Sequence, residues 1–336
     1  MRTVSVVIPA YQAAVYLPSL WRSLEHTGVL RVATEVVFVD DGSTDGTATV
    51  LQEICTAHPG RVAVVTLGSN QGRFFARLRG AEVATGSHVL FLDIRLEPAP
   101  GFGVALTATL AAHDAAMGTV AIDKTKSIFN LYWKRTHDFW FWRNVRDAAR
   151  GFHLTPENYS RYAKGTTVFL CERSLFLSVC RPFENSGLLS DDTRLLYDIA
   201  ARRPIWVEKR LEVSWEPRQT WGSFLARLWE RGPSFAEYHL LKTRGVNCCL
   251  FLVWVLAVVA VLIALVVAPA VGLTVGVAGL LLLAASTAIF AKSVAEFVRL
   301  APLHVASICA CAFGAMWGLV VVLARRARER RSQPHH

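Results

Sequence analysis

Two long stretches without a charged residue constrain most strongly the structures that this chain can adopt. The first runs from Gly245 to Ala291 and the second from Leu300 to Ala324. A helix needs about 20 apolar residues to cross a membrane. The first stretch has room for a hairpin of two spans, 248–268 and 271–291, and the second for a third apolar segment, 303–324. The sequence therefore predicts an integral membrane protein with an α-helical transmembrane region at 248–325.

Basic residues flank these apolar segments and predict their orientation. Lys242 and Arg244 precede the first span, and a basic tail at 326–336 follows the last. Such clusters favour the cytoplasmic side. Three full crossings would separate the two clusters, so we expect two crossings and a membrane-associated third segment. We expect no signal peptide, because Met1-Arg2-Thr3 runs directly into a strand-like segment. We expect a plasma or inner membrane protein with a cytoplasmic N-terminal region, whose membrane helices allow oligomerisation.

Composition excludes several other classes. Hydrophobic residues make up 53% of the 336 residues and charged residues 18%, which is too apolar for an ordinary soluble protein. The seven cysteines form no CxxC pair and no zinc-binding spacing. The net charge is +10, but no compact basic motif or base-stacking module accompanies it, so a nucleic-acid partner is not expected.

The N-terminal part alternates short apolar runs with helical segments. The apolar runs 4–8, 35–39, 61–66 and 88–92 have the length and continuity of strands buried on both faces. Strands that alternate with helices at this spacing predict a doubly wound, mainly parallel α/β sheet. We assign this domain to residues 1–217 and expect amphipathic juxtamembrane helices at 218–247.

Acidic residues end two of these strands. Asp40 and Asp41 follow the second strand, and Asp93 follows the strand that begins at His88. Parallel strands end at one edge of a sheet, where ligands bind in such folds. Carboxylates there suit the hydroxyls and N–H groups of a nucleoside, and a diphosphate requires positive charge. The cations that could supply it are Arg73, Arg77, Arg79 and Arg95.

An aromatic, basic stretch interrupts the domain. Seven aromatic residues lie between Phe129 and Trp142, with cations among them. Tryptophans with flanking cations are typical of an interfacial helix, so Trp140 and Trp142 are predicted to contact the membrane near a lipid-borne acceptor. The alternative is an aromatic stripe that packs on the sheet.

Four stretches of the first 221 residues resemble glycosyltransferase family 2, whose members have the GT-A fold. The stretches are Val4–Tyr11, Val39–Thr47, Asn70–Gly72 and Phe91–Asp93. The resemblance implies an inverting enzyme with a nucleotide-sugar donor. It also implies a nucleobase site lined by Pro9, Ala10 and Tyr11 with Asp40 on the base, and a ribose and metal region at Asp93. Asp41 and Arg77 complete the predicted donor site.

Arg95 departs from the family pattern. The resemblance implies Asp-x-Asp, with Mg²⁺ or Mn²⁺ held against the diphosphate and Asp93 as a metal ligand. The second Asp is replaced here by Arg95, which cannot bind a cation but can pair with a phosphate. We therefore predict weak or absent metal dependence, with Glu97 as the alternative ligand.

A second acidic pair, Asp191 and Asp192, precedes Leu195 and resembles the family's Glu-Asp-x-x-Leu motif. The resemblance implies that Asp192 is the general base, with Asp191 in place of Glu. A sugar hydroxyl needs such a base at neutral pH. Simple capping of the next helix is the alternative. Arg218 and Trp221 loosely resemble the family's acceptor region.

These features predict an inverting transferase that moves a sugar from a nucleotide-sugar to a lipid-linked hydroxyl at the cytoplasmic membrane face, in synthesis of a cell-envelope glycan or glycolipid. One alternative is a polyprenyl-phosphate sugar synthase, whose ionised acceptor needs no base. An alternative of another class is a non-catalytic nucleotide-sugar-binding subunit.

Overall fold

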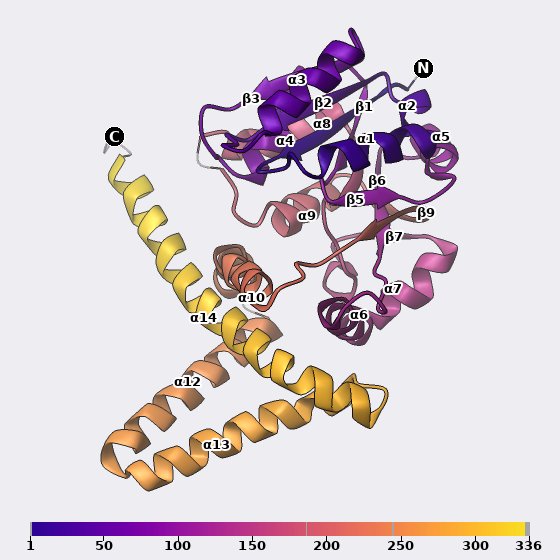
Figure 1. The fold of residues 1–336 in the computed structure, drawn as a ribbon. Helices are drawn as coiled ribbons and strands as arrows, with labels where there is room; N and C mark the ends of the chain where they lie inside the picture. Colours follow the sequence, from indigo (N-terminus) through magenta and orange to yellow (C-terminus); the bar gives the residue numbers. More distant parts are fainter. Residues whose placement is uncertain (1, 186, 244, 333–336) are drawn as a thin grey trace. The chain divides into compact units, whose positions relative to one another are not determined.

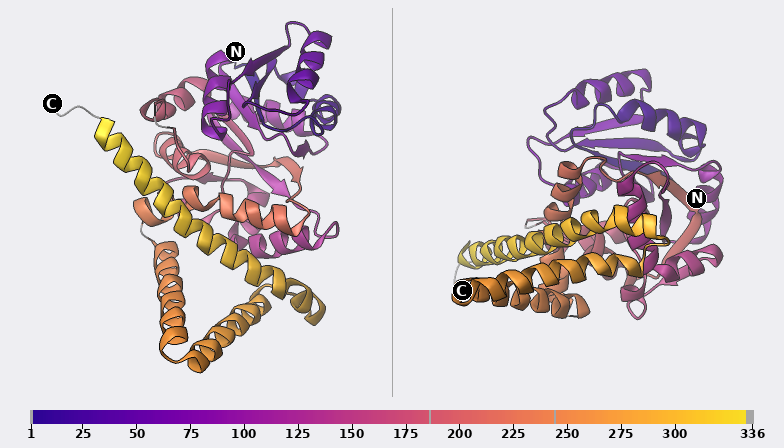
Figure 2. Two further views of the ribbon diagram at one scale, coloured as in Figure 1. Left: turned by 60° about the vertical axis from the view of Figure 1, so that its left-hand side comes forward. Right: turned by 60° about the horizontal axis from the view of Figure 1, so that its bottom comes forward.

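The computed structural model describes residues 2–185, 187–243 and 245–332, without the side chains of Val145, Ala148, Asp191, Thr243 and 328–332. The chain folds into two compact units (Figures 1 and 2). The first contains Met1–Ile122 and Phe141–Glu216, and the second contains Asp123–Trp140 and Pro217–His336.

The first unit is built on a mixed sheet of nine strands in the described part of the chain, in the order β3-β2-β1-β4-β8-β6-β9-β5, with β7 paired to β9. The strands are β1 Val4–Ala10, β2 Glu35–Asp40, β3 Val62–Thr66, β4 His88–Leu92, β5 Leu96–Pro98, β6 Ala115–Ala121, β7 Phe152–Leu154, β8 Val168–Glu172 and β9 Ile205–Trp215.

The parallel arrangement expected from the sequence is confirmed where the predicted site lies. Strands β3, β2, β1 and β4 are parallel neighbours, so Asp40 and Asp93 leave the sheet at the same edge. The other half is mixed, because β8 runs antiparallel to both β4 and β6, while β9 is parallel to β6 and antiparallel to β5 and β7.

Side chains from β1 serve both faces of the sheet, which explains its unbroken apolar sequence. Val6 and Ile8 join one core cluster with Leu20 and Leu51 from covering helices. Val7 points to the opposite face, because successive side chains of a strand alternate. There α4 lies so close that a Cβ on Gly80 would be 2.3 Å from a Val7 methyl carbon.

Short helices connect the strands of the first unit (Figure 1). The α-helices are α1 Leu17–His26, α2 Val29–Val32, α3 Thr47–Ala57, α4 Arg73–Val83, α5 Phe102–Ala112, α7 Trp142–Asp147, α8 Arg173–Cys180 and α9 Leu196–Ala200. The 3₁₀ turns are η1 Ala148–Arg150, η2 Tyr159–Arg161 and η3 Arg181–Phe183, and the π-helical turn η4 covers Asp191–Leu195.

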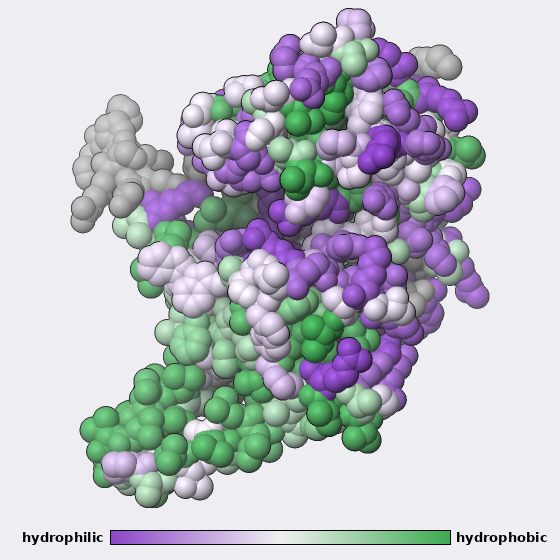
Figure 3. Space-filling model, viewed as in Figure 1, coloured by the Kyte–Doolittle hydropathy of each residue, from purple (hydrophilic) through white to green (hydrophobic). Residues whose placement is uncertain are grey.

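The second unit is helical. Its elements are α6 Ile128–Trp140, α10 Trp221–Glu230, α11 Gly232–Phe235, the π-helical η5 Ala236–Thr243, α12 Val246–Val267, α13 Pro269–Ala285, the 3₁₀ turn η6 Ser286–Ile289 and α14 Val294–Ser332. Among the described residues, three segments are long and apolar enough to span a membrane: Val246–Val267, Pro269–Ile289 and Val294–Ala327. The surface of the α12–α13 hairpin is almost uniformly apolar (Figure 3).

Helix α6 packs within this second unit rather than on the sheet. Phe129 and Tyr132 are buried in a cluster with Phe224 of α10 and Leu303 of α14. Arg135 donates two hydrogen bonds to Glu296 of α14, at 2.8 and 2.5 Å. The aromatic stripe is therefore largely a packing surface, and its partners are helices near the apolar segments.

The junction between α10 and α11 approaches α14 closely through glycines. A Cβ on Gly232 would lie 1.8 Å from the carbonyl oxygen of Gly314, and one on Gly318 would lie 2.2 Å from the carbonyl carbon of Gly232. Small residues allow such backbone contact between helices.

Candidate active site

The two acidic residues at the end of β2 have different surroundings. Asp40 is 1% exposed and accepts a hydrogen bond from the backbone N–H of Ser43 at 3.0 Å. Asp41 accepts from the N–H groups of Gln71 and Gly72 at 2.7 and 2.9 Å. Burial raises the pKa of the Asp41 carboxyl, although both N–H bonds act to lower it. Asp41 thus anchors the loop before α4. Asp40 is therefore the stronger candidate for contact with the nucleobase of the nucleotide-sugar.

The loop after β1 is fastened to the loop after β2. The side-chain hydroxyls of Ser43 and Thr47 accept hydrogen bonds from the N–H groups of Gln12 and Ala13, at 3.0 and 2.8 Å. Gly42 has φ of 72°, and a Cβ there would lie 2.5 Å from the carbonyl carbon of Ser69. The Gly-Ser-Thr-Asp run therefore holds the backbone in place beside Asp40.

The predicted nucleobase residues lie on this fastened loop or just before it. Pro9 and Ala10 are the last residues of β1, and the side chain of Ala10 is buried. Tyr11 follows with 47% of its surface exposed. An exposed aromatic ring at a strand end can stack on a base, whereas the buried Ala10 side chain belongs to the core beneath the sheet edge.

At the end of β4, Asp93 pairs with a buried arginine. The distance from Arg77 Nη2 to Asp93 Oδ1 is 3.2 Å, and the side chains are 2% and 30% exposed. The N–H of Asp93 donates to the carbonyl of Thr167 at 3.2 Å. A buried guanidinium is costly unless a partner carboxylate offsets its desolvation. Arg77 therefore holds Asp93 in place and leaves part of its carboxylate open to solvent.

Arg95 lies in the turn after β4 and leans toward the loop after β1. Its guanidinium carbon is 4.6 Å from the centre of the Tyr16 ring, which is a cation–π distance. Tyr16 is the N-cap residue of α1. The contact places a fixed positive charge between the loop that carries Tyr11 and the strand end that carries Asp93.

Asp192 lies in the π-helical turn η4 and is linked to α4. Arg73 Nη2 is 3.8 Å from Asp192 Oδ2, with side chains 41% and 31% exposed. Thr193 donates its hydroxyl to Asp192 Oδ1 at 3.3 Å. Arg73 and Arg77 are four residues apart and share one face of α4. Asp192 and Asp93 are thereby brought to the same side of one helix.

At the place where the family pattern has two carboxylates, this chain has one carboxylate, Asp93, and one guanidinium, Arg95. The described residues contain no group of three or more His, Cys, Asp or Glu side chains that could hold a metal ion, so a divalent ion here would depend on the Asp93 carboxylate and on the phosphates of a bound donor. Asp93 is paired with one guanidinium, and the position two residues later carries another. Glu97, the alternative ligand, is exposed on β5.

The remaining predicted residues lie elsewhere. Trp142 is 49% exposed in α7 of the first unit, with Arg143 and Arg146 stacked on its ring at 4.9 and 5.0 Å. Trp140, Arg218 and Trp221 belong to the second unit, where both tryptophans are exposed, at 66% and 45%, and Arg218 lies 3.8 Å from Glu230. Asp191 begins η4, and its side chain lies outside the described part.

Three residues with contacts near the predicted site have no part in the sequence predictions: Tyr16 contacts Arg95, Tyr159 bonds to the carbonyl of Thr193, and Lys164 donates to the carbonyl of Tyr159. Tyr16 and Lys164 had no sequence signal, because each acts only through a contact formed in the fold. Tyr159 stood in the Asn-Tyr-Ser triplet that resembles a glycosylation sequon, and its hydroxyl in fact donates to the carbonyl of Thr193, beside Asp192.

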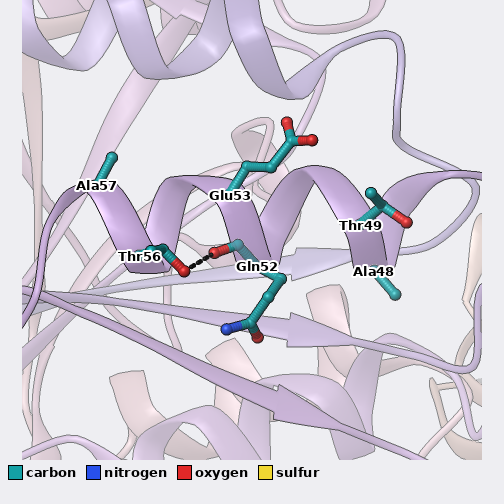
Figure 4. A pocket seen from close by; sticks show the side chains of 6 residues that line it. All are labelled: Ala48, Thr49, Gln52, Glu53, Thr56 and Ala57. Carbon is teal, nitrogen blue, oxygen red and sulfur yellow. Dashed lines mark hydrogen bonds between the residues drawn. The ribbon is translucent and has the colours of Figure 1, made fainter.

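A shallow hollow elsewhere in the first unit does not include these residues. It follows the exposed face of α3 (Figure 4) and is lined by Ala48, Thr49, Gln52, Glu53, Thr56 and Ala57. Glu53 is its single charged residue, so we assign it no part in the chemistry.

Comparisons with known proteins agree with this fold and identify the family. A family model described as "Glycosyl transferase family 2" matches residues 5–172, which is half of the 336 residues. The chain belongs to this glycosyltransferase family, as its motifs predicted.

Curated relatives are similar to this chain over about half of its length. The undecaprenyl-phosphate 4-deoxy-4-formamido-L-arabinose transferase of Pectobacterium carotovorum is 28% identical over 180 residues, covering 53% of this chain and 55% of the relative. The protein of that name from Pseudomonas aeruginosa is 30% identical over 177 residues, covering 52% of each. The chain thus spans about half the length of the curated relatives it matches.

A solved structure confirms the GT-A fold. The mannosyltransferase of Pyrobaculum calidifontis, in complex with GDP-Man and Mn²⁺, superposes with a TM-score of 0.58. It is 18% identical in sequence, and the match covers 94% of this chain and 87% of that one.

Proposed function

We propose that this protein transfers a sugar, with inversion, from a nucleotide-sugar donor to a lipid-linked hydroxyl acceptor at the cytoplasmic face of the membrane. The observation that carries the proposal is the double pairing on α4. Arg77 meets Asp93 and Arg73 meets Asp192, so the predicted donor acid and the predicted base lie at one helix face. The apolar helices of the second unit favour an acceptor held in a bilayer.

The donor is bound at the carboxyl ends of β1, β2 and β4. Tyr11 offers its exposed ring to the nucleobase, and Asp40 offers a carboxylate for N–H groups of the base. The open part of the Asp93 carboxylate accepts from ribose hydroxyls. These roles use the three strand ends that the parallel sheet brings together.

The Asp192 carboxylate supplies general-base catalysis. As the acceptor hydroxyl attacks the anomeric carbon, its proton passes to Asp192. The new bond to the acceptor oxygen forms while the bond to the phosphate oxygen breaks, and the electron pair leaves with the nucleoside diphosphate. Attack opposite the leaving group inverts the anomeric centre.

Arg95 offsets the diphosphate charge in this proposal. A guanidinium pairs with phosphate oxygens through two N–H bonds, and the Tyr16 ring holds Arg95 at the strand end. We expect EDTA to change nucleotide affinity by less than about 2-fold in the wild type. In Arg95→Asp, which restores Asp-x-Asp, Mn²⁺ should strengthen nucleotide binding. A wild type that loses binding in EDTA and regains it with Mn²⁺ would contradict this role.

A second acceptor class is a polyprenyl phosphate. Two observations favour it: the names of the curated relatives, and Arg73, which provides a cation 3.8 Å from Asp192. A phosphate acceptor gives an acid-labile phosphodiester sugar, whereas a hydroxyl acceptor gives an acid-resistant glycoside. Mass spectrometry of the product before and after mild acid separates the two.

The test of the main proposal uses the full chain in lipid nanodiscs. A thermal-shift screen of nucleotide-sugars selects the donor, and lipid-linked sugars serve as acceptors. We expect release of the nucleoside diphosphate and a glycosylated lipid. Nucleotide binding with neither transfer nor slow donor hydrolysis would instead identify a non-catalytic binding subunit.

A further inference from the structure

One segment of the first unit reaches both predicted reacting regions. The segment Tyr159–Thr167, called here the bridging segment, begins at η2 and leads into β8. At one end, the Tyr159 hydroxyl donates to the carbonyl of Thr193, the residue after Asp192. At the other end, the carbonyl of Thr167 accepts the N–H of Asp93 at 3.2 Å. The bridging segment thus connects the backbone next to Asp192, the predicted general base, to the backbone of Asp93 in the predicted donor site.

Tyr159 contacts the Asp192 region in two ways. Besides its hydroxyl bond, its ring meets the ring of Tyr197 on α9 edge to face, with centroids 5.3 Å apart. Helix α9 continues directly from the π-helical turn that contains Asp192. Tyr159 is 3% exposed, so both contacts are shielded from water. A buried hydrogen bond from a hydroxyl to a backbone carbonyl is costly to break, because breaking it leaves a buried polar group unsatisfied. This bond therefore holds the two residues together.

The π-helical turn is a structure that depends on such contacts. These turns are rare, occur as single turns, and are frequent at functional sites. Within η4, the carbonyl of Ser190 accepts the N–H groups of Thr193 and Arg194 at 3.0 and 2.8 Å. The Tyr159 hydroxyl therefore adds a side-chain contact from outside the turn, one residue from Asp192.

Lys164 holds Tyr159 in place. Its ammonium donates to the carbonyls of Tyr159 and Tyr162, the latter at 3.0 Å, and lies 4.3 Å from the centre of the Tyr159 ring. Asn158 fixes the start of the same turn, because its side chain accepts from the N–H of Thr155 at 2.9 Å and donates to the carbonyl of His153 at 2.8 Å. The hydroxyl of Tyr159 is thereby presented by a rigid loop.

We propose that Tyr159 is a positioning residue that acts through Asp192, and that Lys164 holds Tyr159 for this role. The inference rests on the proposed function, because it assigns Asp192 the part of the base. It goes further in identifying the group that fixes the Asp192 backbone relative to Asp93. A small displacement of a reacting group has a large effect on rate and little on binding.

The test compares two Tyr→Phe variants of the same loop. Tyr159→Phe keeps the ring on Tyr197 and removes the bond to Thr193. Tyr162→Phe removes a hydroxyl that donates to Asp147 at 2.7 Å instead. We expect Tyr159→Phe to lower kcat about 10- to 30-fold while donor KM and nucleotide Kd change less than about 2-fold. Tyr162→Phe should leave kcat within about 2-fold of the wild type.

A double-mutant cycle shows whether Tyr159 acts through the base. Asp192→Glu keeps a carboxylate at position 192 but moves it by one methylene. The kcat of this variant should therefore depend less on where the backbone at position 192 is held. In that background, Tyr159→Phe should cost less than about 3-fold in kcat. Equal losses in both backgrounds, or a parallel loss of nucleotide affinity, would overturn the positioning role and leave the proposed function intact. A wild type that transfers no sugar would overturn both.

Discussion

The charged side chains of the two units are used in opposite ways. In the first unit, the Arg73–Asp192 and Arg77–Asp93 pairs meet at 3.8 and 3.2 Å, and both carboxylates are about one third exposed. In the second unit, Arg135 and Glu296 form a two-point pair that is 8% and 19% exposed. A carboxylate that stays about one third exposed can still bind a substrate, whereas a nearly buried pair fastens two helices together. Charge removal should therefore affect chemistry in one unit and stability in the other.

The largest effect is expected at the base. Asp192→Asn should lower kcat by about 100- to 10,000-fold, the contribution typical of general-base catalysis, with little change in thermal stability. Turnover and unfolding temperature of the same preparation provide the measurement. Asp198→Asn is the matched control, because Asp198 pairs with Arg194 at 3.7 Å, one turn away. Full turnover in Asp192→Asn would remove the base assignment.

The opposite behaviour is expected for the helix pair. Arg135→Met leaves Glu296 without its two guanidinium bonds, so the second unit should lose about 3 kcal/mol of stability. Nucleotide Kd should stay unchanged. Lys134→Met removes a half-buried pair with Asp138 on the same helix, whose side chains are 32% and 31% exposed, and should cost less than about 1 kcal/mol. Thermal unfolding in detergent compares the two variants, and equal shifts would contradict the distinction.

A smaller, selective effect is expected at the exposed tryptophans. The Trp140→Ser, Trp142→Ser double variant should lower transfer to lipid acceptors about 5-fold and leave donor hydrolysis nearly unchanged, because interfacial tryptophans anchor a protein to lipid. Val104→Ser, at a side chain 78% exposed on α5, is the control. Equal losses of both activities would show that the tryptophans serve packing.

The smallest effect concerns Lys164. Burial lowers the pKa of its ammonium from 10.5 to about 8. Between these pH values the unfolded chain binds more protons than the folded one, so this group makes stability rise with pH. The rise in unfolding temperature from about pH 8 to about pH 10 should be larger in the wild type than in Lys164→Met. Lys209→Met, at an exposed lysine, should keep the wild-type slope.

Local sequence patterns predicted the parallel half of the fold and the residues at its edge. Apolar runs gave β1, β2 and β4 because strands buried on both faces need them, and the acids at their ends followed from the direction of those strands. The family resemblance added Asp192, which local patterns alone left as a helix cap. The apolar hairpin was equally visible, since length and lack of charge define it.

The remaining features depend on contacts between distant residues. Nothing in the sequence of β8 indicates that it runs antiparallel to β4. Asp40 and Asp41 read alike in the sequence, and only the fold shows that Asp41 binds the loop before α4. Likewise, the Arg73–Asp192 pair joins residues more than a hundred positions apart, which no local pattern can encode.

Helix α6 has a consequence for biosynthesis. Its flanks, Ile122 and Phe141, belong to the first unit, yet the helix belongs to the second. Its partners Glu296 and His304 are 161 and 172 residues later in the chain than Arg135 and Tyr132. The aromatic face of α6, which α10 also contacts, therefore stays only partly covered on the growing chain until the last helix has been made. A version truncated after Glu216 would expose that face to water, and it should aggregate unless residues 123–140 are replaced by a short polar linker.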